Sequence, residues 1–142
     1  MSIRTAKAVW EGTVKEGKGA ISIPDNQINE KYSYSTRFAE TKGSGPEELL
    51  AAAEAGCYSM ALSEVLVNNG FNPKRLDTTA KVHIDKVGDA FKITTIELNA
   101  NGVVPGINAN EFQTFAERAK LNSPICQTVG NVNIKLHAQL QN

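Results

Sequence analysis

The chain has 142 residues, with 15 Lys and Arg against 15 Asp and Glu, so its formal net charge at pH 7 is zero. This balance excludes the basic excess with which proteins bind nucleic-acid phosphates, and we expect no nucleic-acid partner. At 41% hydrophobic residues the chain can bury a core as one soluble domain over residues 1–142, and no apolar run approaches the ~20 residues that a membrane span needs, so we expect no membrane partner.

The first part of the chain predicts strands. Residues 8–12 and 19–23 are short strand-like runs joined by a polar, glycine-containing turn, which is typical of a hairpin. In the next run Tyr32, Tyr34, Thr36 and Phe38 alternate with polar side chains, a period of two. We therefore expect a third strand that holds Arg37 on the face opposite the aromatic residues.

A long central helix follows. Ser44 and Glu47 have the spacing of a capping box, Pro46 is tolerated in a first turn, and Asn69-Gly70 is a helix-ending pair. Residues 49–62 of this helix are apolar nearly all round, which is typical of a helix that is buried on every side. A chain of this length has little material to surround such a helix, so we infer that a second copy of the protein covers it.

Two more strands are predicted beyond the helix, over 78–84 and 91–98, joined by a turn at 87–90. The step from Ile93 to Ile96 breaks the alternation and indicates a bulge or twist. Strands and helices are thus segregated along the chain, which predicts an α+β fold.

The last part of the chain predicts two helices and a strand. Apolar residues recur at helical spacing after Asn108, with Glu111 in the capping-box position, and a short helix begins at Ser123-Pro124. Residues 132–140 alternate as a closing strand.

The chemistry centres on Cys57, near the middle of the apolar helix. The N-terminus lacks the apolar stretch of a secretion signal, so we expect a reducing, cytoplasmic environment in which Cys57 and Cys126 are redox-active or plain core residues. A thiol in an apolar wall is inert unless a neighbouring group favours the thiolate. A fixed guanidinium does so, and Arg37 is a candidate.

Other site chemistries have weaker support. His83 and His137 fall on the polar phase of their strands, away from both cysteines, which argues against a metal site and makes a Cys-His hydrolase improbable. Gly17-Lys18-Gly19 and Gly43-Ser44-Gly45 lack the strand and helix context of a phosphate loop and are explained as turns.

Several stretches together resemble the osmotically inducible protein C (OsmC) and organic hydroperoxide resistance (Ohr) family, closest to its OsmC branch. The resemblance covers essentially the whole chain, and the spacing from the Pro-Glu-Glu-Leu motif to the cysteine is its most specific part. The stretches are 37–38 (RF), 46–53 (PEELLAAA), 55–62 (AGCYSMAL), 76–80 (LDTTA) and 104–106 (VPG).

The resemblance implies an intertwined homodimer with a buried central helix and antiparallel sheets. It implies a peroxidase that reduces organic hydroperoxides to alcohols with two cysteines and no cofactor. In this family pattern Cys57 is the peroxidatic thiol that becomes a sulfenic acid, and Arg37 and Glu47 are the activating pair. The resemblance also implies that a dithiol, of the lipoyl type in this family, then reduces the disulfide.

The chain departs from the family pattern at its second cysteine. Members usually place the resolving thiol before a proline, as Cys-Pro-Val-Ser, whereas this chain reads Ser123-Pro124-Ile125-Cys126. If Ser123 caps the short helix, Cys126 lies near the third helical position, about 5–6 Å from where the family thiol projects. We expect Cys126 to be the resolving thiol.

Each of these residues also has an ordinary structural explanation. Cys57 and Cys126 can be buried core residues, Glu47 a helix-capping carboxylate and Arg37 a solvated strand residue. Tyr58, Phe38 and Met60 line either an apolar substrate pocket or the core. The alternative function is a redox-sensing or ligand-binding protein in which Cys57 is oxidised but not recycled.

Overall fold

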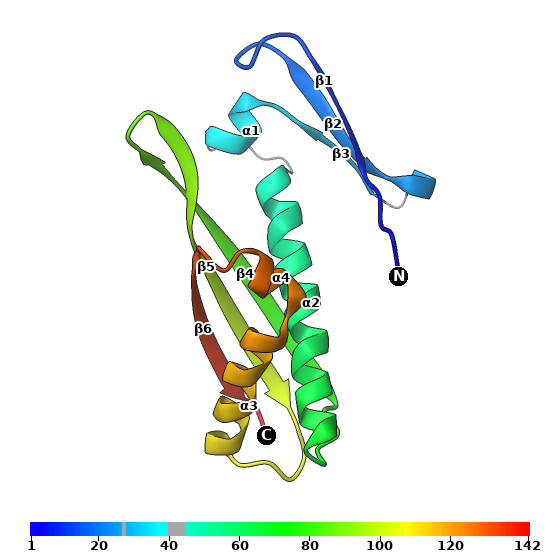
Figure 1. Cartoon of the computed structure of the whole chain (residues 1–142), viewed down its shortest axis with the longest axis vertical. Helices are drawn as coiled ribbons and strands as arrows, with labels where there is room; N and C mark the ends of the chain where they lie inside the picture. The colour runs from blue at the N-terminus through cyan, green and yellow to red at the C-terminus, as the bar shows by residue number, and fades with distance from the viewer. Residues whose placement is uncertain (27, 40–44) are drawn as a thin grey trace. The chain divides into compact units, whose positions relative to one another are not determined.

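The computed structural model describes residues 1–26, 28–39 and 45–142. They divide into two compact units, residues 1–49 and 50–142, and each unit is described by itself (Figure 1). Helix α2, Pro46–Asn68, begins at the end of the first unit and runs into the second. The expectation of one domain over the whole chain remains a prediction.

The first unit is built on a three-stranded antiparallel sheet in the order β1-β2-β3. Its strands are β1 (Lys7–Glu11), β2 (Lys18–Ile23) and β3 (Ile28–Tyr32), with a short 3-10 turn, Pro24–Asn26, between the last two. The predicted hairpin is confirmed, because β1 pairs with β2 from Lys7 opposite Ser22 to Glu11 opposite Lys18.

The predicted strand over residues 32–38 is wrong beyond Tyr32. The chain instead forms a one-turn helix, α1 (Tyr34–Phe38), with Ser33 as its N-cap. Ser33 Oγ accepts from the Thr36 backbone N–H at 3.3 Å, and Thr36 Oγ1 accepts from the Ser33 backbone N–H at 2.8 Å. This reciprocal pair satisfies two helix-start donors, and it outweighs the strand preference of the alternating aromatic residues.

Helix α2 has the predicted length. It begins at Pro46 and is followed by Gly70 at φ +86°, the left-handed conformation that ends helices at glycine. Ser44, the expected N-cap, lies outside the described residues. The helix is buried on one side only within this chain: Glu54, Tyr58 and Leu62 are fully buried, whereas Met60 is 77% exposed.

Helix α2 is also long and apolar enough to cross a membrane, by length and composition, over an 18-residue window. The expectation that no segment approaches this length is therefore wrong by that criterion. A third of the window is buried inside the chain, and the core helix of a soluble protein can pass the same test.

The second unit has a mixed three-stranded sheet in the order β4-β5-β6. Strands β4 (Arg75–Val87) and β5 (Ala90–Val103) form a long antiparallel hairpin, and the predicted irregularity is confirmed as a register shift beside Ile84, which pairs with Ile93. Strand β6 (Asn133–Leu140) pairs with β5 in parallel. The expected antiparallel sheets are therefore wrong for this edge, because alternation fixes which face a residue occupies but not strand direction.

Two helices lie between β5 and β6. The predicted capping box is confirmed at α3 (Ala109–Asn122), where Asn108 Oδ1 accepts from the Glu111 N–H at 2.9 Å. Helix α4 (Pro124–Thr128) follows directly. The core of this unit forms where α2, α3 and α4 meet the sheet, and its members include Tyr58, Leu62, Leu66, Leu98, Val104, Phe112, Ala116, Ala119 and Cys126.

Glycine is required where α3 packs on the sheet. A Cβ atom at Gly102 would lie 2.7 Å from the ring of Phe112, closer than carbon atoms approach one another. The bare backbone of β5 thus lets the Phe112 ring of α3 sit directly on the strand.

Candidate active site

Cys57 lies on α2 with its thiol half-buried, in contact with the start of α4. The hydroxyl of Ser123 donates a hydrogen bond to Cys57 Sγ at 3.2 Å. The sulfur is therefore neither sealed in the core nor freely solvated. A partly accessible thiol with a fixed polar partner is suited to react with a small molecule.

Ser123 reaches Cys57 because of its place between two helices. It ends α3, where its backbone N–H donates to Ala119 O at 2.9 Å, and it is the N-cap residue of α4. Its side chain makes no capping hydrogen bond, so it serves Cys57 instead. Ser123 is fully buried, which holds the hydroxyl in one place.

Cys126 has a different partner. It is at the third position of α4, as predicted, and 4% of it is exposed. Its thiol donates to Glu54 Oε2 at 3.1 Å, and Glu54 on α2 is itself fully buried. The other carboxylate oxygen, Glu54 Oε1, has no hydrogen-bond partner among the residues that the structure describes.

These surroundings make both groups reluctant to ionise. Burial is the main cause that raises the pKa of Cys126 to about 11. A hydrogen bond with Ser123 lowers this pKa, and the hydrogen bond to Glu54 raises it. Burial also raises the pKa of Glu54 above its usual value, which the hydrogen bond from Cys126 partly offsets. At neutral pH Cys126 is therefore a thiol and not a thiolate.

The two contacts form parallel rungs between α2 and α4. Glu54 and Cys57 are three residues apart on α2, and Ser123 and Cys126 are three apart at the start of α4. The pairs run in opposite order, Glu54 with Cys126 and Cys57 with Ser123. The two sulfurs therefore belong to different contacts, and their positions on the two helices are diagonal to each other.

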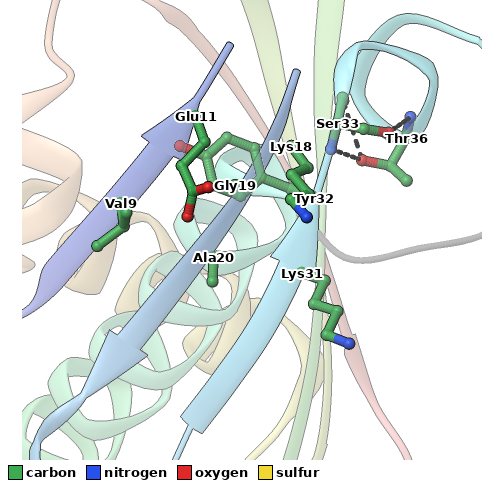
Figure 2. Close-up of a pocket in the computed structure, with 9 residues that line it drawn as sticks. All are labelled: Val9, Glu11, Lys18, Gly19, Ala20, Lys31, Tyr32, Ser33 and Thr36. Atoms are coloured by element: carbon green, nitrogen blue, oxygen red, sulfur yellow. Dashed lines mark hydrogen bonds between the residues drawn. The ribbon is translucent and has the colours of Figure 1, made fainter. Parts of the chain in front are cut away.

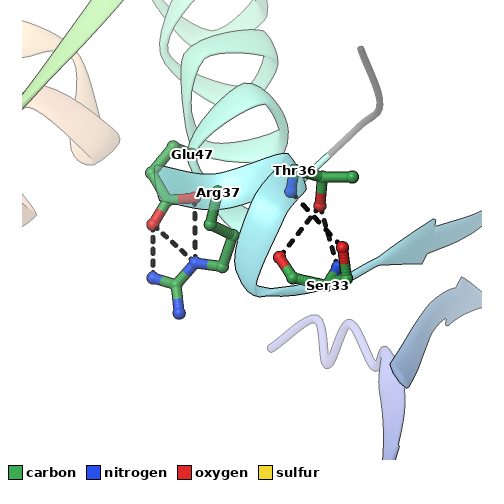
Figure 3. Close-up of polar contacts among 4 residues, drawn as sticks. All are labelled: Ser33, Thr36, Arg37 and Glu47. Carbon is green, nitrogen blue, oxygen red and sulfur yellow. Dashed lines mark hydrogen bonds and ion pairs between the residues drawn. The ribbon is translucent and has the colours of Figure 1, made fainter. Parts of the chain in front are cut away.

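The other predicted pair, Arg37 and Glu47, is brought together in the first unit (Figure 3). Arg37 Nε donates to Glu47 Oε1 and Oε2 at 3.1 and 3.2 Å, and Nη2 also bonds to Oε1. The pair is partly buried, Glu47 at 12% exposed, and its hydrogen bond is the main cause that raises the pKa of Arg37. Glu47 orients the guanidinium and is more than a helix cap.

An aromatic hollow of about 230 Å³ borders Arg37 within the first unit. The guanidinium also lies over the ring of Phe38, 4.7 Å from its centre. Of the three apolar residues named from the sequence, Phe38 therefore lines a pocket, whereas Tyr58 is a core residue whose hydroxyl donates to Ala116 O at 2.9 Å. The hollow is lined by Trp10, Val14, Tyr32, Ser33, Tyr34, Arg37 and Phe38.

A second hollow, of about 410 Å³, lies on the sheet of the first unit (Figure 2). Lys18, Lys31 and Glu11 line it together with Ser33 and Thr36. The two hydroxyl groups are used in the capping box of α1, as the dashed lines in Figure 2 show. These two hydroxyl groups are therefore engaged in local helix capping.

The histidines take no part in either cluster. Both are exposed, as the sequence predicted, and His83 Nε2 lies 3.1 Å from Glu97 Oε1 across the β4-β5 hairpin. Within residues 1–26, 28–39 and 45–142, no three His, Cys, Asp or Glu side chains gather as a metal site.

Comparison with known proteins identifies the family. The model of the family described as "OsmC-like protein" matches residues 39–137, which hold both cysteines and all of α2. The chain belongs to the OsmC-like family. It is 43% identical to "Peroxiredoxin OsmC" of Escherichia coli over 97% of this chain and 96% of that protein.

More distant OsmC-like relatives match at nearly full length. The chain is 29% identical to an organic hydroperoxide resistance protein of Xanthomonas axonopodis pv. citri over 93% of this chain and 92% of that protein. Among solved structures, an organic hydroperoxide resistance protein of Elizabethkingia anophelis superposes with a TM-score of 0.78 at 25% identity, covering 99% of each chain. The α+β fold expected from the sequence is thus confirmed as OsmC-like.

Of the four predicted OsmC-like site residues, Arg37 contacts Glu47, and Cys57 and Cys126 lie in a second cluster. Sequence reasoning missed Ser123 and Glu54 as partners of the two sulfurs. Glu54 carried a signal, because it is the one charged residue in the apolar run 49–62. Ser123 carried one too, as the residue that stands where the family places a thiol.

Proposed function

We propose that this protein is a thiol-dependent peroxidase that reduces organic hydroperoxides at Cys57. The observation that carries the proposal is the half-buried Cys57 thiol with its fixed Ser123 partner, on the most specific motif of a family whose members include a peroxiredoxin. The thiolate attacks the terminal oxygen of R–O–O–H. The O–O bond breaks, Cys57 becomes a sulfenic acid, and R–O⁻ leaves and is protonated to the alcohol.

Arg37 and Glu47 assist this step in the proposal. A guanidinium has five N–H donors in a fixed plane, and Glu47 engages those at Nε and Nη2. Among the described residues Glu47 is the hydrogen-bond partner of this guanidinium, and its remaining donors can serve the substrate oxygens, where negative charge develops as the O–O bond breaks. The adjoining aromatic hollow can take an alkyl chain, which favours bulky organic hydroperoxides over hydrogen peroxide.

The active protein is a homodimer in this proposal, and each site combines two subunits. Glu47 and Cys57 are ten residues apart on the continuous helix α2, which corresponds to about 15 Å of rise and ~80° around the axis. A carboxylate cannot span that distance. We infer that the Arg37–Glu47 pair serving one Cys57 belongs to the partner subunit, in a twofold-symmetric arrangement.

The outer face of α2 supports the dimer. Five small or apolar residues are exposed along it, although a helix this apolar is normally covered. A second copy of the chain would bury this stripe. The stripe consists of Ala52, Ala53, Gly56, Met60 and Val67.

Turnover requires a second half-reaction. In the proposal Cys126 attacks the Cys57 sulfenic acid, a disulfide forms and water leaves, and an external dithiol, of the lipoyl type in this family, restores both thiols in the cytoplasm. Cys126 borders a hollow of about 290 Å³ with Leu121 and Ile134, which offers a dithiol a route toward its sulfur.

A redox sensor is the second candidate, favoured by one observation. Cys126 bonds to Glu54 and not to Cys57, so a sulfenic acid at Cys57 has no thiol as its immediate partner. The two functions differ in turnover. A sensor would consume one equivalent of peroxide and stop, whereas a peroxidase would continue as long as dithiol is present.

The test is a steady-state assay with tert-butyl hydroperoxide and dihydrolipoamide, with hydrogen peroxide as the comparison. We expect many turnovers and a higher kcat/KM for the organic peroxide. A stop after one equivalent would support the sensor, and equal or reversed efficiencies would remove the proposed role of the aromatic hollow.

Subunit mixing tests the shared site. Cys57→Ser and Arg37→Ala proteins should each be inactive, and their heterodimers should hold one intact site and recover part of the activity. No recovery after verified subunit exchange would mean that each subunit carries a complete site.

A further inference from the structure

Glu54 is a buried carboxylate that neither the fold nor the family motif explains. It is fully buried in a helix stretch that is otherwise apolar, and among the residues that the structure describes no ion pair includes it. Burying a charge without an ionic partner is costly, and an apolar side chain of similar size would fill the same space more favourably. Glu47 on the same helix differs, because Arg37 balances its charge.

The contacts of Glu54 point to a proton acceptor. Its Oε2 already accepts a hydrogen bond from the Cys126 thiol at 3.1 Å, and its Oε1 has no hydrogen-bond partner in the described part of the chain. Glu54 also precedes Cys57 by three residues, so the carboxylate lies about 5–6 Å along the helix surface from the peroxidatic position. The same group thus contacts the Cys126 sulfur and lies one helix turn from Cys57.

Cys126 needs such a group if it is to act. A thiol attacks only as its thiolate, and the buried surroundings of Cys126 hold it protonated at neutral pH. A base in direct contact can remove the proton during the attack, so the thiolate need never accumulate.

We propose that Glu54 is the general base and then the general acid of the disulfide-forming step, an inference that rests on the proposed peroxidase function. Cys126 Sγ attacks Cys57 Sγ, the S–S bond forms and the S–O bond of the sulfenic acid breaks. Glu54 Oε2 takes the proton from Cys126, and the carboxylic acid gives it to the leaving hydroxide, which departs as water. The Cys126 sulfur is oxidised and the Cys57 sulfur is reduced.

Glu54→Gln is the decisive variant, because the amide can still accept the thiol hydrogen bond but cannot take the proton. The protein is mixed with one equivalent of tert-butyl hydroperoxide and quenched at intervals with dimedone. Mass spectrometry then counts the Cys57 sulfenic acid and the Cys57–Cys126 disulfide. Glu64→Gln, an exposed carboxylate on the same helix, is the matched control.

We expect Glu54→Gln to form the sulfenic acid at the wild-type rate within about two-fold and to form the disulfide about 10²-fold more slowly, the usual effect of losing a general base. Glu54→Asp keeps a carboxylate but places it farther from Cys126, because its side chain is one methylene shorter. Its rate of disulfide formation should lie between those of wild type and Glu54→Gln. Glu54→Asp carries the test if the amide variant folds poorly. A wild-type rate of disulfide formation in either folded variant would overturn the proposal.

A double variant separates catalysis from a structural effect. In Cys126→Ser, which has no thiol to activate, adding Glu54→Gln should change neither the formation nor the decay of the sulfenic acid. A change in that background would assign Glu54 to Cys57 and overturn its role in resolution. If wild-type protein forms no sulfenic acid at all, the peroxidase function itself fails, which is a distinct outcome.

Discussion

The hydroxyl of Ser123 donates a hydrogen bond to the sulfur of Cys57 across 3.2 Å. In the family pattern the residue before this proline is the resolving thiol, and here it is a serine followed three residues later by Cys126. A hydroxyl can hold the sulfur by a hydrogen bond but cannot form a disulfide with it. In the proposed cycle, contact with the Cys57 sulfur and formation of the disulfide therefore fall to two different residues, Ser123 and Cys126.

Exchanging the two residues should speed up the resolving step. In Ser123→Cys/Cys126→Ser the thiol stands where the hydroxyl now contacts Cys57, so we expect the disulfide to form about ten-fold faster or more, since reaction rates depend steeply on the separation of the reacting atoms. Quenched-flow peptide mapping without reductant measures this. A slower reaction than wild type would show that the position of Cys126 is the better one.

Removing the carboxylate that orients Arg37 should impair the peroxide step. Glu47→Gln leaves the guanidinium without its charged, two-oxygen partner, and we expect kcat/KM for tert-butyl hydroperoxide to fall about 10²-fold. Glu117→Gln, which breaks the more exposed ion pair with Lys120, is the control and should leave kcat/KM unchanged. Equal effects of both variants would argue against a specific role for Glu47.

The exposed stripe of α2 should be sensitive to charge only if a second subunit covers it. Met60 is 77% exposed in the single chain, so Met60→Glu costs little in a monomer but places a charge in the proposed interface. We expect the dimer dissociation constant to rise about 30-fold or more, as for an interface residue worth about 2 kcal/mol. Sedimentation measures it, with Val87→Glu, an exposed apolar residue of the hairpin, as the control.

The buried carboxylate should make stability depend on pH. Burial raises the pKa of Glu54, so its stabilising contribution is fully present below pH 4.5 and is lost as the pH rises through the folded-state pKa. Glu54→Met should therefore be more stable than wild type at pH 7.5, by about 1 kcal/mol or more, and the advantage should shrink toward pH 4. Urea unfolding at both pH values checks this, and a constant difference would contradict it.

The regular elements were predictable because their signals are local. Asn108 and Glu111 define the start of α3, and Gly70 ends α2 in the left-handed conformation that few other residues adopt. The strand expected at 32–38 failed for a local reason too, because the side chains of Ser33 and Thr36 satisfy a helix start. The alternation of aromatic and polar residues therefore did not distinguish a strand that continues to Phe38 from one that ends at Tyr32 and is followed by a helix.

The candidate active site was predictable only in part. Cys57, Arg37 and Glu47 lie in motifs with fixed spacing, so the resemblance nominates them as site residues. The contacts of Ser123 and Glu54 depend on how α4 packs against α2, across sequence separations of 66 and 72 residues. No pattern along the chain gives such a contact, and a carboxylate in an apolar helix is meaningful only once its thiol partner is known.

The brevity of α4 has a consequence for the catalytic cycle. The sulfurs of Cys57 and Cys126 now contact Ser123 and Glu54, so they must move closer together before a disulfide can form. One of the two helices must therefore rearrange when the bond forms. Helix α2 has 23 residues and α4 has five, and a single turn opens at far lower cost than the middle of a long helix. Oxidation should therefore speed up amide hydrogen exchange at 124–128. The exchange rate of this single helical turn would then report the redox state of the protein.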